Sequence, residues 1–168
     1  MKPANAGSSV GISKAHNRNE LVVAIEAASK VDSRILVEEN IDGQEVECAV
    51  FGRDELVVSV IGEILPAAEF YDFEAKYKAD SGLVIPARLT EEKTAEVKAL
   101  AEKTYRALDC AGMTRVDFFV RKSDGSVLLN EPNTIPGFTS ISMYPKLMKE
   151  TGVEFTQLIS NLLKSAEI

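Results

Sequence analysis

Four polar side chains in the second half of the chain have the types and spacing needed to bind a metal ion and phosphate. They are Arg115, Asp117, Glu131 and Asn133, and they lie in the stretch "MTRVDFFVRKSDGSVLLNEPN" (113–133). Apolar and β-branched residues on both sides of "SDG", a typical turn sequence, predict a β-hairpin. The chemistry of these residues therefore depends on which of them face each other.

The geometry of a hairpin gathers these four side chains on one face. If its turn centres near Asp124, Asp117 faces Glu131, and side chains two residues apart place Arg115 beside Asp117 and Asn133 beside Glu131. Opposed carboxylates repel unless a cation compensates them. Carboxylates and an amide oxygen suit Mg²⁺, with phosphate oxygens and waters as its further ligands. The residues alone leave two interpretations open, a magnesium site or a structural cluster of salt bridges to Arg115.

A second candidate is the small-residue stretch "AGSSVG" (6–11). Its glycines and serines could present backbone N–H groups and hydroxyls to a phosphate, and Lys2 would add a positive charge. The stretch lacks the Gly-Lys-Ser/Thr of a Walker A motif and is not a dinucleotide fingerprint. An ordinary turn is the alternative.

The elements that must position these residues predict an α+β fold with an antiparallel sheet. Strands joined by short turns, such as "IDG" between 34–40 and 44–52, are expected to pair antiparallel. Lys2 and Pro3 are expected to end a strand, and a further short strand is expected after the loop in 4–13. The expected strands are 34–40, 44–52, 56–64 and the hairpin 113–133, and the expected helices are 17–30, 90–109, 142–152 and 154–166. The aperiodic stretch 65–83 is expected to be either functional or disordered.

Composition narrows the class of protein. A chain of 168 residues that is 45% hydrophobic predicts one globular domain, and a net charge of −7 argues against a nucleic-acid partner. Without an apolar run of about 18 residues or a signal peptide, no membrane partner and a cytoplasmic location are expected. Cys48 and Cys110 have no paired spacing, so they predict neither a disulfide framework nor a zinc site. His16 is expected to be a solvated surface residue.

Five motifs, read in order, resemble the D-alanine–D-alanine ligases of the ATP-grasp superfamily. They are "GSSVGIS", "LVEENIDGQEVECAV", "FYDFEAKY", "RVDFF" and "NEPNTIPGFTSISMYPKL". The resemblance covers essentially all 168 residues and corresponds to the C-terminal part of such an enzyme. It implies an ATP-grasp C-terminal lobe, a mainly antiparallel sheet flanked by helices. The N-terminal domain and the start of the ATP-grasp domain are expected to be absent from 1–168.

The resemblance also implies a reaction. ATP would phosphorylate the carboxylate of one D-alanine, and the amine of a second would attack the acyl phosphate, giving D-alanyl-D-alanine, ADP and phosphate for peptidoglycan synthesis. The implied partners are two D-alanine molecules, with ATP and two Mg²⁺ ions, for which Mn²⁺ could substitute. The full-length enzyme is expected to be a homodimer.

Residue by residue, the resemblance assigns roles to the positions that match. Asp117, Glu131 and Asn133 match metal ligands, Arg115 matches the residue that stabilises the transferred phosphoryl group, and Gly137 matches a backbone donor to the oxyanion. The positions matching ATP contacts are Lys2, Ser8, Ser9, Glu38, Glu39, Ile41, Glu45, Lys76, Asn130 and Glu131. Those matching catalytic or D-alanine contacts elsewhere are Ser8, Tyr77, Lys76, Ser142 and Met143.

The aperiodic stretch 65–83 matches the family's lid, which would exclude water from the acyl phosphate. Tyr77 within it favours a dipeptide product. A D-alanine–D-lactate-type ligase is the nearest alternative activity, and a module that binds Mg-nucleotide without turnover is another. Because the family's residues for the first D-alanine lie outside the matched region, residues 1–168 alone are expected to be inactive.

Overall fold

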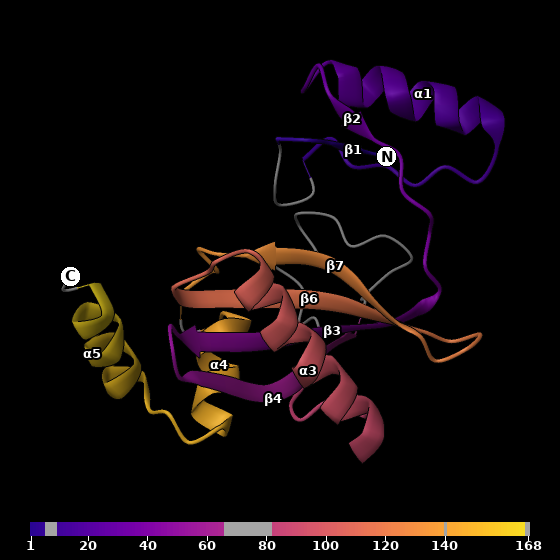
Figure 1. Ribbon diagram of the computed structural model, residues 1–168. Helices are drawn as coiled ribbons and strands as arrows, with labels where there is room; N and C mark the ends of the chain where they lie inside the picture. The colour runs from indigo at the N-terminus through magenta and orange to yellow at the C-terminus, as the bar shows by residue number, and fades with distance from the viewer. Residues whose placement is uncertain (6–9, 66–81, 140, 167–168) are drawn as a thin grey trace. The chain divides into compact units, whose positions relative to one another are not determined.

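The computed structural model describes residues 1–5, 10–65, 82–139 and 141–166 (Figure 1). Its elements in chain order are β1 Lys2–Pro3, α1 Arg18–Ser29, β2 Ile35–Leu36, β3 Gly43–Gly52, β4 Leu56–Leu65, β5 Gly82–Val84, α3 Glu91–Ala107, β6 Gly112–Arg121, β7 Val127–Asn133, α4 Met143–Glu150 and α5 Phe155–Ala166. The composition predicted one globular domain, but the described residues divide into two compact units. The first contains the described residues 1–5, 10–41 and 82, and the second contains 42–65, 83–139 and 141–166.

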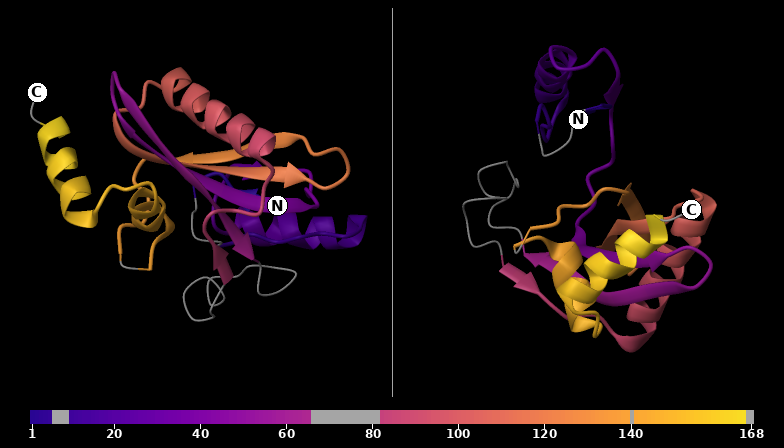
Figure 2. Two further views of the ribbon diagram at one scale, coloured as in Figure 1. Left: turned by 90° about the horizontal axis from the view of Figure 1, so that it is seen from below. Right: turned by 90° about the vertical axis from the view of Figure 1, so that its left-hand side faces the viewer.

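The second unit is built on a five-stranded sheet with the order β5-β4-β3-β6-β7. β3 pairs antiparallel with β4 and β6, and β6 pairs antiparallel with β7. α3 lies on one face of these strands and α4 on the other (Figures 1 and 2). The α+β class with an antiparallel sheet, expected from the sequence, is confirmed.

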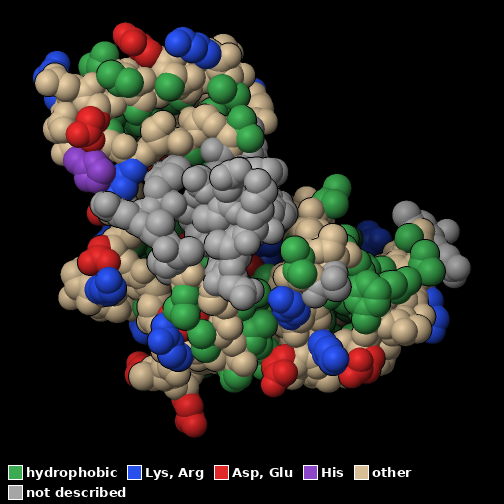
Figure 3. Space-filling view, turned by 180° about the vertical axis from the view of Figure 1, so that it is seen from behind, with side chains coloured by type: hydrophobic (Ala, Val, Ile, Leu, Met, Phe, Trp, Pro, Cys, Tyr) green, Lys and Arg blue, Asp and Glu red, His purple; other side chains and the backbone are tan. Residues whose placement is uncertain are grey.

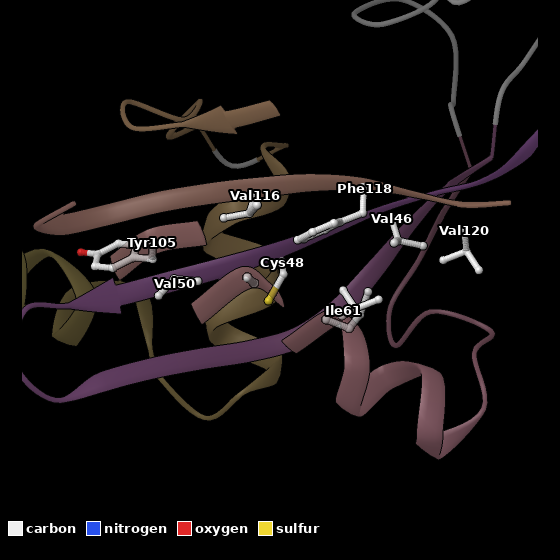
Figure 4. Packing of buried hydrophobic residues seen from close by; sticks show 10 residues of the cluster. Val46, Cys48, Val50, Ile61, Tyr105, Val116, Phe118 and Val120 are labelled. Carbon is white, nitrogen blue, oxygen red and sulfur yellow. The ribbon is translucent and has the colours of Figure 1, made fainter. Parts of the chain in front are cut away.

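The main hydrophobic core lies between this sheet and α3. Alternate residues of each strand point to one face, and the residues of α3 that meet them recur every four positions, as a helix requires. The buried cluster comprises Val46, Cys48, Val50, Ile61, Val97, Ala101, Tyr105, Val116, Phe118 and Val120 (Figure 4). The other residues of the same strands therefore lie on the face that α3 does not cover.

α4 packs closely on that second face because β4 has a glycine there. A Cβ atom added at Gly62 would lie 2.8 Å from Sδ of Met143 and 2.9 Å from a methyl carbon of Leu147. The position opposite Gly62 on β3 is Glu47. A charged residue is therefore the immediate neighbour of the sheet region that α4 covers.

The expected helices are confirmed, and the starts of α1 and α3 follow from capping residues. Asn17 Oδ1 accepts hydrogen bonds from the backbone N–H groups of Asn19 and Glu20, and Thr90 Oγ1 accepts one from Lys93. None of the described helices combines the length and apolar character that crossing a membrane requires.

α5 carries hydrophobic side chains on its surface. Phe155, Ile159 and Leu163 recur every four residues and are 44%, 37% and 67% exposed. Figure 3 shows hydrophobic side chains gathered at the side of the molecule where α5 lies.

Two strand predictions in the first unit are wrong. The strand expected over 34–40 is only β2, and it pairs with β1 rather than with β3. The polar residues after β2 are exposed and favour strands poorly. No strand follows the loop over the described residues 10–13, because Val10 and Gly11 form a turn in which Gly11 has a φ of +73°. The strand end expected at Lys2 is confirmed as β1.

Candidate functional site

The sheet of the second unit carries a row of three carboxylates on three adjacent strands. Glu47 on β3 is the cross-strand partner of Asp117 on β6, which in turn is the partner of Glu131 on β7. Neighbouring strands are about 4.8 Å apart, so each carboxylate lies beside the next. The predicted pairing of Asp117 with Glu131 is confirmed. We name Glu47, Asp117, Glu131, Arg115 and Asn133 the acidic cluster.

Glu47 was missed by the sequence analysis. A signal existed, since Glu47 stands two residues after Glu45 inside the otherwise apolar strand segment "VECAV". A charged residue in the middle of a buried strand is uncommon unless it is paired. The structure shows that Glu47 is only 4% exposed.

Arg115 is the cation of the acidic cluster. Its Nε donates to Asp117 Oδ1 and its Nη2 to Asp117 Oδ2, each at 2.7 Å, so the two side chains form a bidentate pair. The same Nε lies 3.1 Å from Oε2 of Glu47. Arg115 therefore connects the two buried carboxylates of the row.

Asn133 connects Asp117 with Glu131, the carboxylate at the other end of the row. Its Nδ2 donates to Asp117 Oδ2 at 2.9 Å and, at 3.5 Å, to Glu131 Oε1. Asn133 is also the cross-strand partner of Arg115. The four residues predicted to share one face of the hairpin are thus brought together.

The charges of the acidic cluster do not balance. Three carboxylates against one guanidinium leave two negative charges in excess. Burial by itself would lower the pKa of the Arg115 guanidinium, but the hydrogen bonds to Asp117 and the charges of Glu47, Asp117 and Glu131 outweigh it and raise that pKa. Arg115 therefore stays charged, and the cluster can accept further positive charge.

A β-bulge at Asn130 orients the metal-ligand candidates. Asp117 is opposite Glu131, whereas its neighbour Phe118 is opposite Leu129, which leaves Asn130 without a cross-strand position. Because of the bulge, Leu129 and Glu131 fall on opposite faces although they are two residues apart. Bulges commonly redirect side chains next to functional sites.

Gly137 and Ser142, predicted for the oxyanion and the second substrate, lie next to each other. A Cβ atom at Gly137 would be 2.9 Å from Oγ of Ser142. Ser142 Oγ accepts a hydrogen bond from the N–H of Thr139 at 3.0 Å and lies 2.9 Å from Thr139 Oγ1. It makes no capping hydrogen bond to α4, which begins at the buried Met143. The Ser142 hydroxyl is therefore not required for the start of this helix.

The candidate ATP-binding residues of the first unit include an ion pair. Lys2 Nζ on β1 lies 2.9 Å from Glu38 Oε1, two residues after β2. Glu39 is exposed, and the chain passes from the first unit to the second between Ile41 and Asp42. Glu45 belongs to the second unit, where it pairs with Ile64 and Phe119. Four further candidates, Ser8, Ser9, Lys76 and Tyr77, lie outside the described residues.

Two cavities in the described parts of the chain lie away from the acidic cluster. One of about 380 Å³ is lined by residues of α1 and the segment before it, including Ser13 and Glu20. The other, of about 260 Å³, lies at the C-terminal end of α3 and is lined by residues including Arg53 and Cys110. Neither is lined by a residue of the cluster.

Comparison with known protein families shows which family the chain belongs to. The family model described as "D-ala D-ala ligase C-terminus" matches residues 1–164. The chain belongs to the D-alanine–D-alanine ligase family. This membership confirms the resemblance seen in the motifs and the ATP-grasp fold.

Curated members of the D-alanine–D-alanine ligase family are similar along the whole chain. The D-alanine–D-alanine ligase of Caldicellulosiruptor bescii is 56% identical over 167 residues, which are 99% of this chain and 46% of that protein. The one from Chlorobaculum parvum is 57% identical over 164 residues, 97% of this chain and 45% of that protein. The chain therefore spans about half the length of the curated relatives it matches.

Solved structures of this ligase family share the fold. The D-alanine-D-alanine ligase of Coxiella burnetii has a TM-score of 0.86 at 35% identity, over 98% of this chain and 43% of that one. The VanG D-Ala:D-Ser ligase of Enterococcus faecalis has a TM-score of 0.87 at 44% identity, over 97% and 48% of the two chains.

The acidic cluster fits the divalent cation that members of this ligase family use with ATP. The carboxylate oxygens of Asp117 and Glu131 both lie within hydrogen-bonding reach of the Asn133 amide, whose own oxygen is a further hard ligand, and the cluster has excess negative charge. No three His, Cys, Asp or Glu side chains among residues 1–5, 10–65, 82–139 and 141–166 form a cation site by themselves. The amide of Asn133 and oxygens from a phosphate would therefore have to complete the ligand set.

Proposed function

We propose that residues 1–168 form the C-terminal part of the catalytic domain of an ATP-dependent D-alanine–D-alanine ligase. The reaction would join two D-alanines through an acyl phosphate and give D-alanyl-D-alanine, ADP and phosphate for peptidoglycan synthesis. The observation that carries the proposal is the acidic cluster. In a chain of this family, it combines three carboxylates, an amide and a largely buried arginine on one face of the sheet.

In this proposal the acidic cluster binds the phosphates of ATP together with Mg²⁺. Asp117, Glu131 and Asn133 hold the ions, of which we propose two, with Mn²⁺ as a substitute. Bound there, the metal would neutralise the charge of the phosphates. Arg115, whose guanidinium stays charged, would donate to the transferred phosphoryl group and stabilise its negative charge. These roles require an arginine beside the ligands, which the structure provides.

The segment between β7 and α4 would bind the acyl group and the second D-alanine. The N–H of Gly137 would donate to the oxyanion, while Ser142 and the N–H of Met143 would hold the carboxylate of the incoming amino acid. The proximity of Gly137 to Ser142 supports this assignment, since both roles concern adjacent parts of one intermediate. Because Gly137 has no side chain, it would also leave room for the reacting carbonyl group.

The remaining candidate residues would bind the nucleotide and close the site. Lys2 would bind phosphate, Glu38 to Ile41 would hold the adenine and Glu45 the ribose. The assignments of Ser8, Ser9, Lys76, Tyr77 and Asn130 are part of the same proposal. A cytoplasmic location and a homodimeric full-length enzyme are also proposed, and sedimentation of the full-length enzyme would test the latter.

A ligase that uses a different second substrate is the competing activity. The VanG D-Ala:D-Ser ligase of Enterococcus faecalis is 44% identical to this chain. The full-length enzyme should therefore be given ATP and D-alanine as the first substrate, with D-alanine, D-serine or D-lactate compared as the second substrate. We expect D-alanyl-D-alanine to form fastest, and preferential formation of the D-serine or D-lactate product would contradict the proposal.

A nucleotide-binding module without turnover is the second alternative, and it concerns residues 1–168 alone. We expect this chain to bind ATP with Mg²⁺ in calorimetry and to release no phosphate when D-alanine is added. An intact fold that gives no binding heat would argue against the nucleotide site. Phosphate release that depends on D-alanine would show that the chain is active by itself.

A further inference from the structure

We propose that Glu47 is a positioning residue that keeps Arg115 in the acidic cluster when a divalent cation binds Asp117. The inference rests on the proposed function, because it requires Asp117 to bind a cation. None of the motifs that relate the chain to its family assigned a role to Glu47. The argument depends on the contacts of one arginine nitrogen.

Arg115 Nε is shared by two carboxylates. It donates to Asp117 Oδ1 at 2.7 Å, and Oε2 of Glu47 lies 3.1 Å from the same atom. Arg115 Nη2 donates to the second Asp117 oxygen. In this arrangement Asp117 is the main partner of Arg115, and Glu47 is the nearest alternative acceptor.

A cation and Arg115 compete for Asp117. Both carboxylate oxygens of Asp117 accept hydrogen bonds from Arg115, and Oδ2 also accepts one from Asn133. A metal ion that binds an oxygen of Asp117 withdraws negative charge from this carboxylate and so weakens its bonds to Arg115. The guanidinium then needs another carboxylate, since a buried positive charge without a partner is costly.

Glu47 is placed to be that second partner. It faces Asp117 from β3, on the side opposite to Glu131 and Asn133, so a cation held by those residues approaches from the other strand. The side chains of Glu47, Asp117 and Arg115 are only 5%, 5% and 15% exposed. Their positions are fixed by the sheet and by burial, so transfer of the Nε–H bond needs only a small shift of the guanidinium.

The experiment is a titration of the 168-residue chain with Mn²⁺, alone and with saturating ADP, followed by electron paramagnetic resonance. Removing the alternative partner in Glu47→Gln should leave Arg115 on Asp117 and weaken Mn²⁺ binding about tenfold, the usual size of effect for a residue that supports a metal ligand. The matched control is Glu63→Gln. Glu63 is another buried carboxylate of this sheet, paired with Arg88 outside the cluster, and its replacement should leave Mn²⁺ affinity unchanged.

A double-mutant cycle separates positioning from simple charge. If Glu47 acts through Arg115, Glu47→Gln should change Mn²⁺ affinity less than about twofold in the Arg115→Gln background. An equal loss in both backgrounds would show that Glu47 attracts or binds the cation directly, and would overturn the inference while leaving the proposed function intact. Failure of the unaltered chain to bind Mn²⁺ under either condition would overturn both.

A measurement on the unaltered chain covers the case in which Glu47→Gln does not fold. The Nε–H resonance of Arg115 should stay protected from exchange with water when Mg²⁺ saturates the site, because Glu47 then accepts this hydrogen bond. Rapid exchange after Mg²⁺ addition would show that Arg115 has lost its carboxylate partner. That result would overturn the inference.

Discussion

The two faces of the five-stranded sheet are built from alternate residues of the same strands, but one forms the hydrophobic core and the other carries the acidic cluster. Toward α3 lie Val116 and Phe118, both fully buried in the apolar cluster. Between and beside them, Arg115 and Asp117 point to the other face and join the acidic cluster. The comparison teaches that one hairpin can supply stability and binding chemistry at once, because the two-residue period of a strand separates them.

The two faces also differ in the interactions that stabilise their side chains. On the apolar face, α3 covers the strands, and the apolar side chains there require only van der Waals contacts, which the buried cluster provides. The acidic cluster has two negative charges in excess among its own residues, and Arg115 and Asn133 bind its carboxylates. We therefore expect substitutions on the first face to change stability and substitutions on the second to change cation binding.

The strongest test of this division compares two adjacent phenylalanines. Phe118 is fully buried against α3, whereas Phe119 lies on the other face and is only partly buried. Phe118→Ala should lower the free energy of unfolding by about 3–5 kcal/mol, and Phe119→Ala by about 1–2 kcal/mol, as measured in urea. Equal losses would mean that the two faces contribute equally to the core.

The next largest effect concerns an ion pair outside the acidic cluster, between the buried Glu63 and the exposed Arg88. Hydrogen bonds from the Arg88 side chain outweigh burial and lower the pKa of Glu63 from 4.5 to about 2. Because the folded-state pKa is the lower one, the pair stabilises the protein fully above about pH 5. This contribution is lost as the pH falls from about 5 toward 2.

Unfolding experiments at pH 7, 5 and 3 would test this ion pair. Glu63→Gln should be less stable than the unaltered chain at pH 7, by less than Phe118→Ala, and its stability should fall less between pH 5 and 3. Glu102→Gln, which removes an exposed pair with Arg106 on α3, serves as the control. A similar pH dependence in Glu63→Gln and the unaltered chain would contradict the assignment.

Removal of one carboxylate should affect the acidic cluster in two opposite ways. Glu131→Gln should weaken Mn²⁺ binding about tenfold, because a ligand is lost. It should also raise the free energy of unfolding by a few tenths of a kcal/mol, because Glu131 no longer repels the opposed Asp117. Glu150→Gln makes the same change of charge at the end of α4 and should alter neither quantity. Loss of stability together with unchanged Mn²⁺ affinity would assign Glu131 a structural role.

The smallest effects concern the residues that precede two helices. Thr90→Ala should destabilise the protein by about 1 kcal/mol, because Thr90 Oγ1 caps α3. Ser142→Ala should cost less than about 0.5 kcal/mol, because the Ser142 hydroxyl bonds Thr139 rather than capping α4. In the full-length enzyme, Ser142→Ala should instead raise the KM for the second D-alanine. A stability loss as large as that of Thr90→Ala would indicate a capping role.

The sequence predicted local elements better than strand partners. The helices capped by Thr90 and Asn17 carry these signals within a few residues of their starts, and the register of Asp117 with Glu131 follows from the turn of their own hairpin. β2 was placed next to β3 because a short turn separates them in sequence. It pairs with β1 instead, a contact across more than thirty residues that no local pattern encodes.

The sequence by itself determined the family, the alternation of strand faces and the four residues of the hairpin that form most of the acidic cluster. These are properties of neighbouring residues, so spacing and motif suffice to reveal them. Only the tertiary structure decided that β3 lies beside β6, and thereby that Glu47 joins Asp117 and Arg115. The physical reason is that pairing between strands distant in sequence depends on how the whole sheet buries its apolar face, and that burial determines which charged residues meet.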